Sequence, residues 1–265
     1  MLKPMEVGIS LACFYPLEPE KAVKEAQKLG VRICEIFLNT YCELEIPYLK
    51  ELRKACNAAG LKVYSIHPFT SAIENYLFFS PYPRRIADAK AFYARYAEAA
   101  DILGASVVNI HADRGMGLES PDLFASCFQP LLDLQNKTGI IYALENIFYN
   151  SVNHPEFVRR LKRNLPEVRF TFDIKQAFKG SQDAYELADA MGEAIVNFHI
   201  NDRDEDHICA LPGRGNVDYM RIFSVLHKNG YAGPALIEVY RKNFGTAAEL
   251  KESKRWLEEK ILLAK

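Results

Sequence analysis

Short apolar runs alternate with amphipathic stretches along the chain, and most of the apolar runs begin directly after a glycine. Glycine adopts the left-handed conformation that ends many helices, so each such glycine predicts a helix end followed by a strand. The glycines are Gly30, Gly60, Gly104, Gly139, Gly192 and the pair Gly230 and Gly233. With two further apolar runs, the pattern predicts eight strands, at 7–11, 31–38, 61–67, 105–111, 140–147, 168–174, 194–200 and 234–239.

The segments between these runs have the spacing of amphipathic helices. In 84–103 the apolar residues recur at steps of three or four, at Ile86, Phe92, Tyr96, Ala99 and Leu103. Pro121 and Pro155 each precede an acidic residue, which predicts helix starts at both places. Pro130 lies inside the helix expected at 123–134 and predicts a bend or a split there.

Strands that alternate with helices indicate an α/β protein with a parallel sheet, because parallel neighbours need a helical crossover. Eight repeats, and no GxGxxG after the first strand, favour a closed (β/α)8 TIM barrel of eight parallel strands over a doubly wound sheet. The chain has 265 residues and no linker or shift in composition. We therefore expect a single TIM barrel domain over 1–265.

The composition is that of an ordinary globular protein, with 49% hydrophobic and 25% charged residues. A net charge of -1 gives no general attraction for nucleic acid, so no nucleic-acid partner is expected. The six cysteines form no CxxC pair, and we interpret them as structural thiols. No signal-like start and no membrane-length apolar run is present, which predicts a cytoplasmic protein without a membrane partner.

Polar residues stand at the carboxyl ends of six predicted strands, where barrels place their functional groups. They are His67, His111, Glu145, Asp173, His199 and Glu238. The two-residue period of a strand also turns Asn109, Thr171 and Asn197 toward the barrel axis. Three carboxylates and three imidazoles in one mouth require either a cation or protonated acids. A divalent metal ion is the simpler solution.

Three carboxylates with one imidazole suit Mn²⁺, Mg²⁺, Co²⁺ or Zn²⁺. His67 and His111 could hold a second, more zinc-like ion, and the spacing does not decide between one ion and two.

The most specific motifs are Leu144-Glu145-Asn146, Asp173, His199-Ile200-Asn201-Asp202, 212–218 and 236–239. Through them the chain resembles the xylose isomerase-like superfamily, specifically its sugar phosphate isomerase/epimerase group, which is related to endonuclease IV-type barrels. The resemblance covers essentially all eight repeats. It implies that Glu145, Asp173, His199 and Glu238 ligate one divalent ion, and that Glu145 and Glu238 are the catalytic acid and base.

The resemblance implies a small sugar-like substrate, such as a sugar, a sugar phosphate or a cyclitol. A proton removed beside a carbonyl and returned to the other face epimerises the carbon, and return to the adjacent carbon isomerises the sugar. Loss of a neighbouring hydroxyl instead makes a dehydratase. An endonuclease acting on abasic DNA and a non-catalytic binding barrel are the alternatives from other classes.

The chain departs from these relatives at Gln176, where many members of both branches carry a histidine. That difference counts against a keto-sugar 3-epimerase and against a complete three-metal nuclease site. Glu205-Asp206-His207 only approximates a nuclease metal motif, so His207 is either a further metal or substrate ligand or a solvated loop residue.

Lys175, Arg203 and Arg214 are expected near a barrel's usual phosphate position, where they would bind a substrate anion or balance neighbouring acids. Asn109 and Gln176 are further candidates for substrate contacts, and Glu35 is expected to form hydrogen bonds inside the barrel. An aromatic loop is consistent with a substrate lid, a contact in a homo-oligomer, or a loop anchored on the core; its residues are Tyr76, Phe78, Phe79 and Tyr82.

Overall fold

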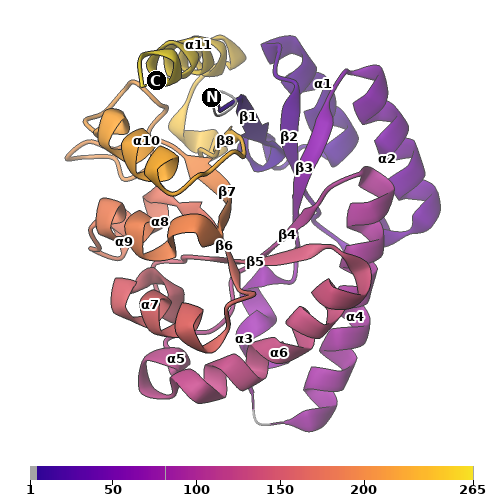
Figure 1. Cartoon of the computed structure of the whole chain (residues 1–265). Helices are drawn as coiled ribbons and strands as arrows, with labels where there is room; N and C mark the ends of the chain where they lie inside the picture. The colour runs from indigo at the N-terminus through magenta and orange to yellow at the C-terminus, as the bar shows by residue number, and fades with distance from the viewer. Residues whose placement is uncertain (1–4, 81, 265) are drawn as a thin grey trace.

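The computed structural model describes residues 5–80 and 82–264, and its strands form a closed parallel barrel (Figure 1). Each strand pairs with the next one in the sequence, and β1 pairs with β8 to close the ring. The strands are β1 (Val7–Ser10), β2 (Ile33–Phe37), β3 (Lys62–His67), β4 (Val107–Ile110), β5 (Ile141–Glu145), β6 (Arg169–Asp173), β7 (Ile195–Ile200) and β8 (Ala235–Ile237). Each lies inside its predicted range, so the prediction of a (β/α)8 barrel is confirmed.

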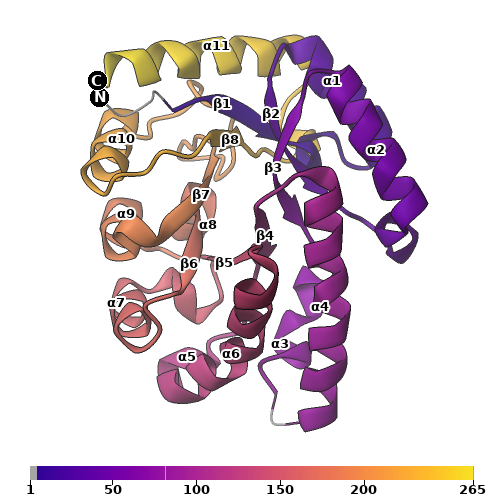
Figure 2. The same cartoon turned by 45° about the vertical axis from the view of Figure 1, so that its right-hand side comes forward.

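Helices surround the strands on the outside (Figures 1 and 2). They are α1 (Pro19–Leu29), α2 (Ile46–Ala58), α3 (Glu74–Leu77), α4 (Pro83–Leu103), α5 (Met116–Glu119), α6 (Pro121–Thr138), α7 (Pro155–Asn164), α8 (Ile174–Lys179), α9 (Ala184–Met191), α10 (Tyr219–Lys228) and α11 (Ala247–Leu263). The larger helices contact one another in chain order, and α11 returns to contact α1. This outer ring covers the apolar face of the strands.

The predicted helix ends are confirmed at five glycines, whose φ angles lie between 70° and 75°: Gly30, Gly60, Gly104, Gly139 and Gly230. Gly192 differs, because its φ of 58° is combined with a ψ of -133°, outside the left-handed helical region. The helix starts at Pro121 and Pro155 are also confirmed. α6 runs uninterrupted through Pro130, so the helix is not split there.

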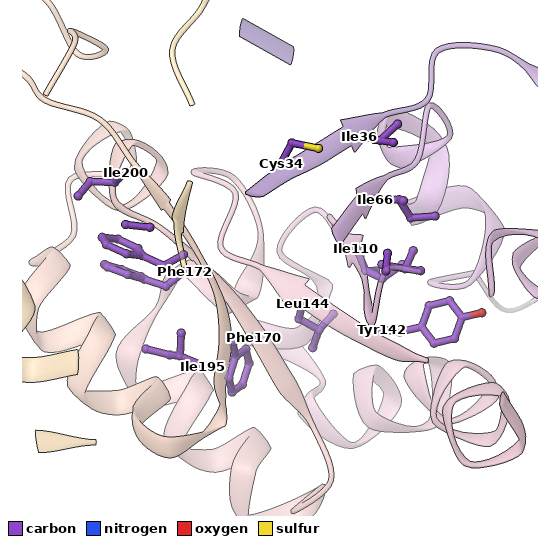
Figure 3. Packing of buried hydrophobic residues seen from close by; sticks show 14 of the residues in the cluster. Cys34, Ile36, Ile66, Ile110, Tyr142, Leu144, Phe170, Phe172, Ile195 and Ile200 are labelled. Atoms are coloured by element: carbon purple, nitrogen blue, oxygen red, sulfur yellow. The ribbon is translucent and has the colours of Figure 1, made fainter. Parts of the chain in front are cut away.

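Side chains alternate along the strands, and this alternation separates the apolar core from the polar interior of the barrel. Apolar residues such as Ile66, Ile110, Leu144, Phe170 and Phe172 are fully buried on the helix-facing side (Figure 3). Phe172 stacks on Phe198 with ring centroids 5.5 Å apart and 11° between the planes. Their immediate neighbours in sequence point inward and carry the polar groups of the site.

Strand register sets the height of the inward residues. Ser10 pairs with Glu35, and a register shift between Cys34 and Glu35 aligns Glu35 with Ser65 on the next strand. Nearer the carboxyl ends, Asp173 pairs with His199. The barrel interior therefore holds one polar layer at the level of Glu35 and another at the strand ends.

Two expectations depend on residues outside the described ranges: the lack of a signal sequence at the start, and the exact limits of a domain at 1–265. Within the described part of the chain, no helix combines the length and the apolar character needed to cross a membrane. The six cysteines are all free thiols, and of these only Cys42 is exposed.

Candidate functional site

The polar strand ends meet at one mouth of the barrel. Glu145 and Asp173 are the last residues of β5 and β6, His199 is the last but one of β7, and Glu238 directly follows β8. One possible ligand atom from each of these four residues lies within 4.8 Å of the other three. We call Glu145, Asp173, His199 and Glu238 the strand-end cluster.

The strand-end cluster has the unsatisfied atoms that a metal site requires. In residues 5–80 and 82–264, seven buried side-chain nitrogen or oxygen atoms lack a hydrogen-bond partner. Four of them belong to the cluster, one from each member: Glu145 Oε2, Asp173 Oδ2, His199 Nδ1 and Glu238 Oε2. Although they form no hydrogen bonds, they have charged neighbours: His199 Nδ1 lies 2.7 Å from Glu238 Oε2, and Asp173 Oδ2 lies 3.1 Å from Lys175 Nζ. Buried polar atoms are otherwise almost always paired. Three carboxylate oxygens and one imidazole nitrogen around a common space fit a divalent cation.

One layer below, Glu35 is fully buried and its carboxylate collects hydrogen bonds from four other strands. Its oxygens accept hydrogen bonds from five side chains, Ser10, Ser65, Asn109, Asn197 and His199. Asn109 Oδ1 in turn accepts a hydrogen bond of 2.5 Å from Thr171 Oγ1. We call these residues, without His199, the Glu35 layer. The expected hydrogen-bonding role of Glu35 inside the barrel is confirmed.

The Glu35 layer fixes the orientation of His199. His199 Nε2 lies 3.1 Å from Glu35 Oε2, and this contact leaves Nδ1 directed at the strand-end cluster. When only Nε2 is protonated, it donates a hydrogen bond to Glu35, and the lone pair of Nδ1 faces the cluster. A carboxylate behind a histidine is the arrangement that orients metal-binding imidazoles in proteins.

The close approach of several charged groups shifts their pKa values in different directions. Burial alone would raise the pKa of Glu238, but Lys175 and His199 outweigh it and hold the pKa at about 2. For Asp173, burial dominates over the attraction of Lys175 and raises the pKa to about 6. Burial also opposes ionisation of Glu145, yet the close approach of His111, His199 and His67 keeps its pKa well below its usual range.

His67 and His111 form a second group with Glu145. Their Nε2 atoms lie 2.9 Å apart, and each lies within 3.5 Å of Glu145 Oε2. Burial lowers the pKa of His67, but the hydrogen bond and the charge of Glu145 raise it overall. These three residues also satisfy the geometric conditions for holding a metal ion.

A cleft of about 370 Å³ opens above the strand-end cluster. Glu145 and Glu238 line it, whereas Asp173 and His199 lie beneath its floor. The other polar residues of its wall are His67, Ser71, His111, Tyr149, Lys175, Gln176, Lys179 and Tyr240. Phe37, Phe69 and Phe148 supply apolar surface. The cleft is large enough for a small molecule that contacts both glutamates.

Several residues predicted from the sequence lie away from this cleft. Asn109 is enclosed in the Glu35 layer, and the exposed His207 pairs with Asp204 in the loop after β7. Arg214 forms ion pairs with Glu249 and with another acid of α11, and Arg203 stacks on Phe178. The structure does not bring these side chains to the cleft.

The aromatic loop is anchored on the core by half of its members. Phe78 and Phe79 are buried against Tyr93 and Phe124, while Tyr76 and Tyr82 are exposed. None of its four aromatic residues is among the described residues that line the cleft.

Several residues that shape the site were not predicted from the sequence, among them Lys179, Tyr240 and Glu74. Lys179 and Tyr240 line the cleft, and Glu74 accepts hydrogen bonds from the backbone N–H groups of His111 and Ala112. Lys179 was recognisable in principle, because it lies four residues after Lys175 and so on the same face of a helix. Glu74 had no such signal, since its partners are 37 and 38 residues away.

Comparisons with known proteins agree with this architecture. A family model described as xylose isomerase-like TIM barrel matches residues 23–260. An uncharacterized protein of Mycobacterium leprae is 22% identical over 275 residues, which cover 92% of each chain. An uncharacterized protein of Mycobacterium tuberculosis is 22% identical over 278 residues, which cover 94% of each chain.

Several solved structures share the fold. A D-tagatose 3-epimerase-like protein has a TM-score of 0.78 at 19% identity, with 98% of each chain covered. D-psicose 3-epimerase of Clostridium cellulolyticum, solved with D-tagatose, has a TM-score of 0.78 at 16% identity and covers 98% of this chain and 99% of its own. 3-keto-D-glucoside 4-epimerase of E. coli has a TM-score of 0.76 at 18% identity, with 96% and 99% covered.

Proposed function

This chain belongs to the xylose isomerase-like TIM barrel family, and from that premise we propose that it is a divalent-metal-dependent isomerase or epimerase of a small sugar or related polyol. The observation that carries the proposal is the convergence of four possible ligand atoms within 4.8 Å in the strand-end cluster, where each residue has a buried atom that forms no hydrogen bond. The names of the structural neighbours, which are sugar 3- and 4-epimerases, support the same class of reaction.

Glu145, Asp173, His199 and Glu238 would hold the metal ion. When bound, such an ion polarises a carbonyl group and lowers the cost of the negative charge that develops on its oxygen. Glu35 would keep Nδ1 of His199 available as a ligand, because it would accept a hydrogen bond from a protonated Nε2.

Glu145 and Glu238 would transfer the proton. They are the two members of the strand-end cluster that line the cleft, so they alone of the four can contact substrate there. Carboxyl groups serve as general bases when ionised and as general acids when protonated. One glutamate, in its carboxylate form, would remove a proton beside the carbonyl, and the other, in its carboxylic acid form, would donate its own proton to the opposite face to complete an epimerisation.

A second candidate function is a nuclease with more than one metal ion. The group of His67, His111 and Glu145 favours it, because these residues could hold an additional ion. Gln176, which stands where such a nuclease would carry a metal-binding histidine, counts against it. The number of bound ions therefore separates the two functions.

The first experiment measures metal content by elemental analysis of protein purified without chelator. We expect one Mn, Mg, Co or Zn ion per chain, retained in His67→Ala and lost in Glu238→Gln. Glu252→Gln, which changes an exposed glutamate of α11, is the matched control and should keep its ion. A parent protein without metal contradicts the proposal, and two or three ions favour the nuclease.

The second experiment detects proton transfer without knowledge of the true substrate. Metal-loaded protein is incubated with a panel of ketoses in D₂O, and NMR follows exchange of the hydrogen beside the carbonyl. With enough added Mn²⁺ for each variant to bind the ion again, Glu145→Gln and Glu238→Gln should each slow the exchange by about 10²–10⁴-fold, as expected for loss of a general base or acid. If either variant exchanged the hydrogen as fast as the parent protein, the assignment of that glutamate would be contradicted.

A further inference from the structure

The charged groups that line the cleft are unevenly distributed. Among the described residues of its wall, the carboxylates are Glu145 and Glu238, and both are assigned above to the metal site. The basic groups of the wall are Lys175, Lys179, His67 and His111. A substrate in this cleft would therefore meet cationic groups and no further acid.

Lys175 is the most unusual of these groups, because its side chain is only 2% exposed. Its Nζ lies 3.1 Å from Asp173 Oδ2 and 3.7 Å from Glu238 Oε2. It also lies 5.0 Å from the centre of the Tyr240 ring. Burying an ammonium group is unfavourable unless nearby carboxylates compensate for its lost hydration. In the metal-free chain, Asp173 and Glu238 provide that compensation.

Metal binding changes this balance of charge. When one of the two glutamates carries the proton that it returns to the substrate, the other two carboxylates of the strand-end cluster match the charge of a divalent ion, and the ammonium of Lys175 has no counter-charge left. Once Asp173 and Glu238 bind an ion, they balance Lys175 less strongly. A neutral sugar offers the buried ammonium no replacement partner, whereas a negatively charged group on the substrate does.

Lys179 extends the cationic side of the cleft to its rim. It lies one helical turn after Lys175 on α8, and its Nζ lies 3.9 Å from the centre of the Phe148 ring. Close by, the guanidinium of Arg114 lies 4.7 Å from the ring centre of Tyr149, which also lines the cleft. Exposed cations beside a cleft attract anions toward it.

We infer that the substrate is a polyhydroxy carboxylic acid, whose carboxylate is bound by the buried ammonium of Lys175 and attracted into the cleft by Lys179. The inference rests on the proposed function, because it requires a metal ion in the strand-end cluster. A carboxylate is favoured over a phosphate at the far end of a sugar, since Lys175 lies at the cluster and not at the rim.

Calorimetric titration of the Mn²⁺-loaded protein tests this with three probes of one carbon skeleton: xylitol, D-xylonate and xylitol 5-phosphate. We expect D-xylonate to bind at least about tenfold more tightly than xylitol, the effect of one charge-assisted hydrogen bond. Lys175→Gln should remove this preference. Lys179→Gln should reduce it by about two- to threefold at low salt and leave no effect at about 0.5 M NaCl.

Lys242→Gln is the matched control, because Lys242 is exposed in the loop after β8 and does not line the cleft. Lys179 is also exposed, so its variant keeps the test decisive even if Lys175→Gln does not fold. In that case, an unchanged preference in Lys179→Gln at low salt overturns the inference.

Other outcomes also overturn the inference. A D-xylonate preference that survives in Lys175→Gln would come from the metal ion alone. Tighter binding of xylitol 5-phosphate than of D-xylonate, lost in Lys179→Gln, would assign the anion to the rim. Equal binding of xylitol and D-xylonate by protein that does bind Mn²⁺ would refute the inference alone, whereas absence of Mn²⁺ binding would refute the proposed function.

Discussion

The Glu35 layer and the strand-end cluster lie one above the other in the same barrel, yet they differ in how completely their buried polar atoms are hydrogen-bonded. Both carboxylate oxygens of Glu35 accept hydrogen bonds, and its neighbours in the layer are also connected. Each member of the strand-end cluster instead has one buried atom that forms no hydrogen bond. A layer whose polar atoms are all hydrogen-bonded stabilises the fold and orients its neighbours. Buried polar atoms without hydrogen bonds are available to bind a ligand, but they lower the stability of the fold.

We expect the largest changes in stability and metal affinity for Glu35→Ala. Loss of this buried carboxylate removes the acceptor of five hydrogen bonds and should lower the free energy of unfolding by about 3–5 kcal/mol. It should also weaken metal binding by about 10–100-fold, because His199 loses the group that orients it. Denaturant unfolding of the metal-free protein and a metal titration measure the two effects.

Ser10→Ala is the control for that variant. It removes one hydrogen bond to Glu35 and should cost only about 1 kcal/mol, with little change in metal affinity. If Glu35→Ala were as stable as Ser10→Ala, the Glu35 layer would not have the structural role assigned to it.

A smaller effect of opposite sign is predicted for Asp173→Asn in the metal-free protein. The folded chain raises the pKa of Asp173 from 3.8 to about 6, so folding disfavours its ionised form. The resulting loss of stability begins as the pH rises above 3.8 and is complete above about 6. Asparagine cannot ionise, and its Oδ1 can still accept the hydrogen bond from Gln176 N that caps α8.

We therefore expect Asp173→Asn to raise the Tm of the metal-free protein at pH 7.5, and the gain to shrink as the pH falls from 6 toward 4. A stabilisation of 1 kcal/mol corresponds to about 2–4 °C in a chain of this size. Thermal unfolding across this pH range measures it. In the same variant, added Mn²⁺ should no longer raise the Tm. If the variant were less stable than the parent at pH 7.5, ionised Asp173 would not destabilise the metal-free protein as expected.

The smallest effect is predicted outside both layers, for Arg214→Ala. Arg214 pairs with Glu249 across 2.7 Å, but its side chain is 48% exposed, so the pair should contribute less than about 1 kcal/mol. Metal affinity and D-xylonate binding should be unchanged. A loss of anion binding in this variant would restore Arg214 as a substrate ligand, and would weaken the assignment of that role to Lys175.

The residues near the site differ in how well the sequence predicted them. Glu145, Asp173, His199 and Glu238 were recognisable because each stands at a strand end, and strand ends of a barrel converge. The positions of Arg203 and Arg214 were not predictable in the same way. They lie in a long loop, where the period of a strand or helix no longer indicates the direction of a side chain.

The sequence by itself determined the order of strands and helices, the closure of the barrel and the inward direction of the strand-end residues. These features follow from local periodicity, from glycine at helix ends and from the alternation of side chains along a strand. Only the tertiary structure decided which polar atoms are paired. The partners of Glu35 come from four other strands, and Lys175 approaches Glu238 from 63 residues earlier in the chain. Such contacts depend on register and rotamers across the whole barrel, and no local pattern encodes them.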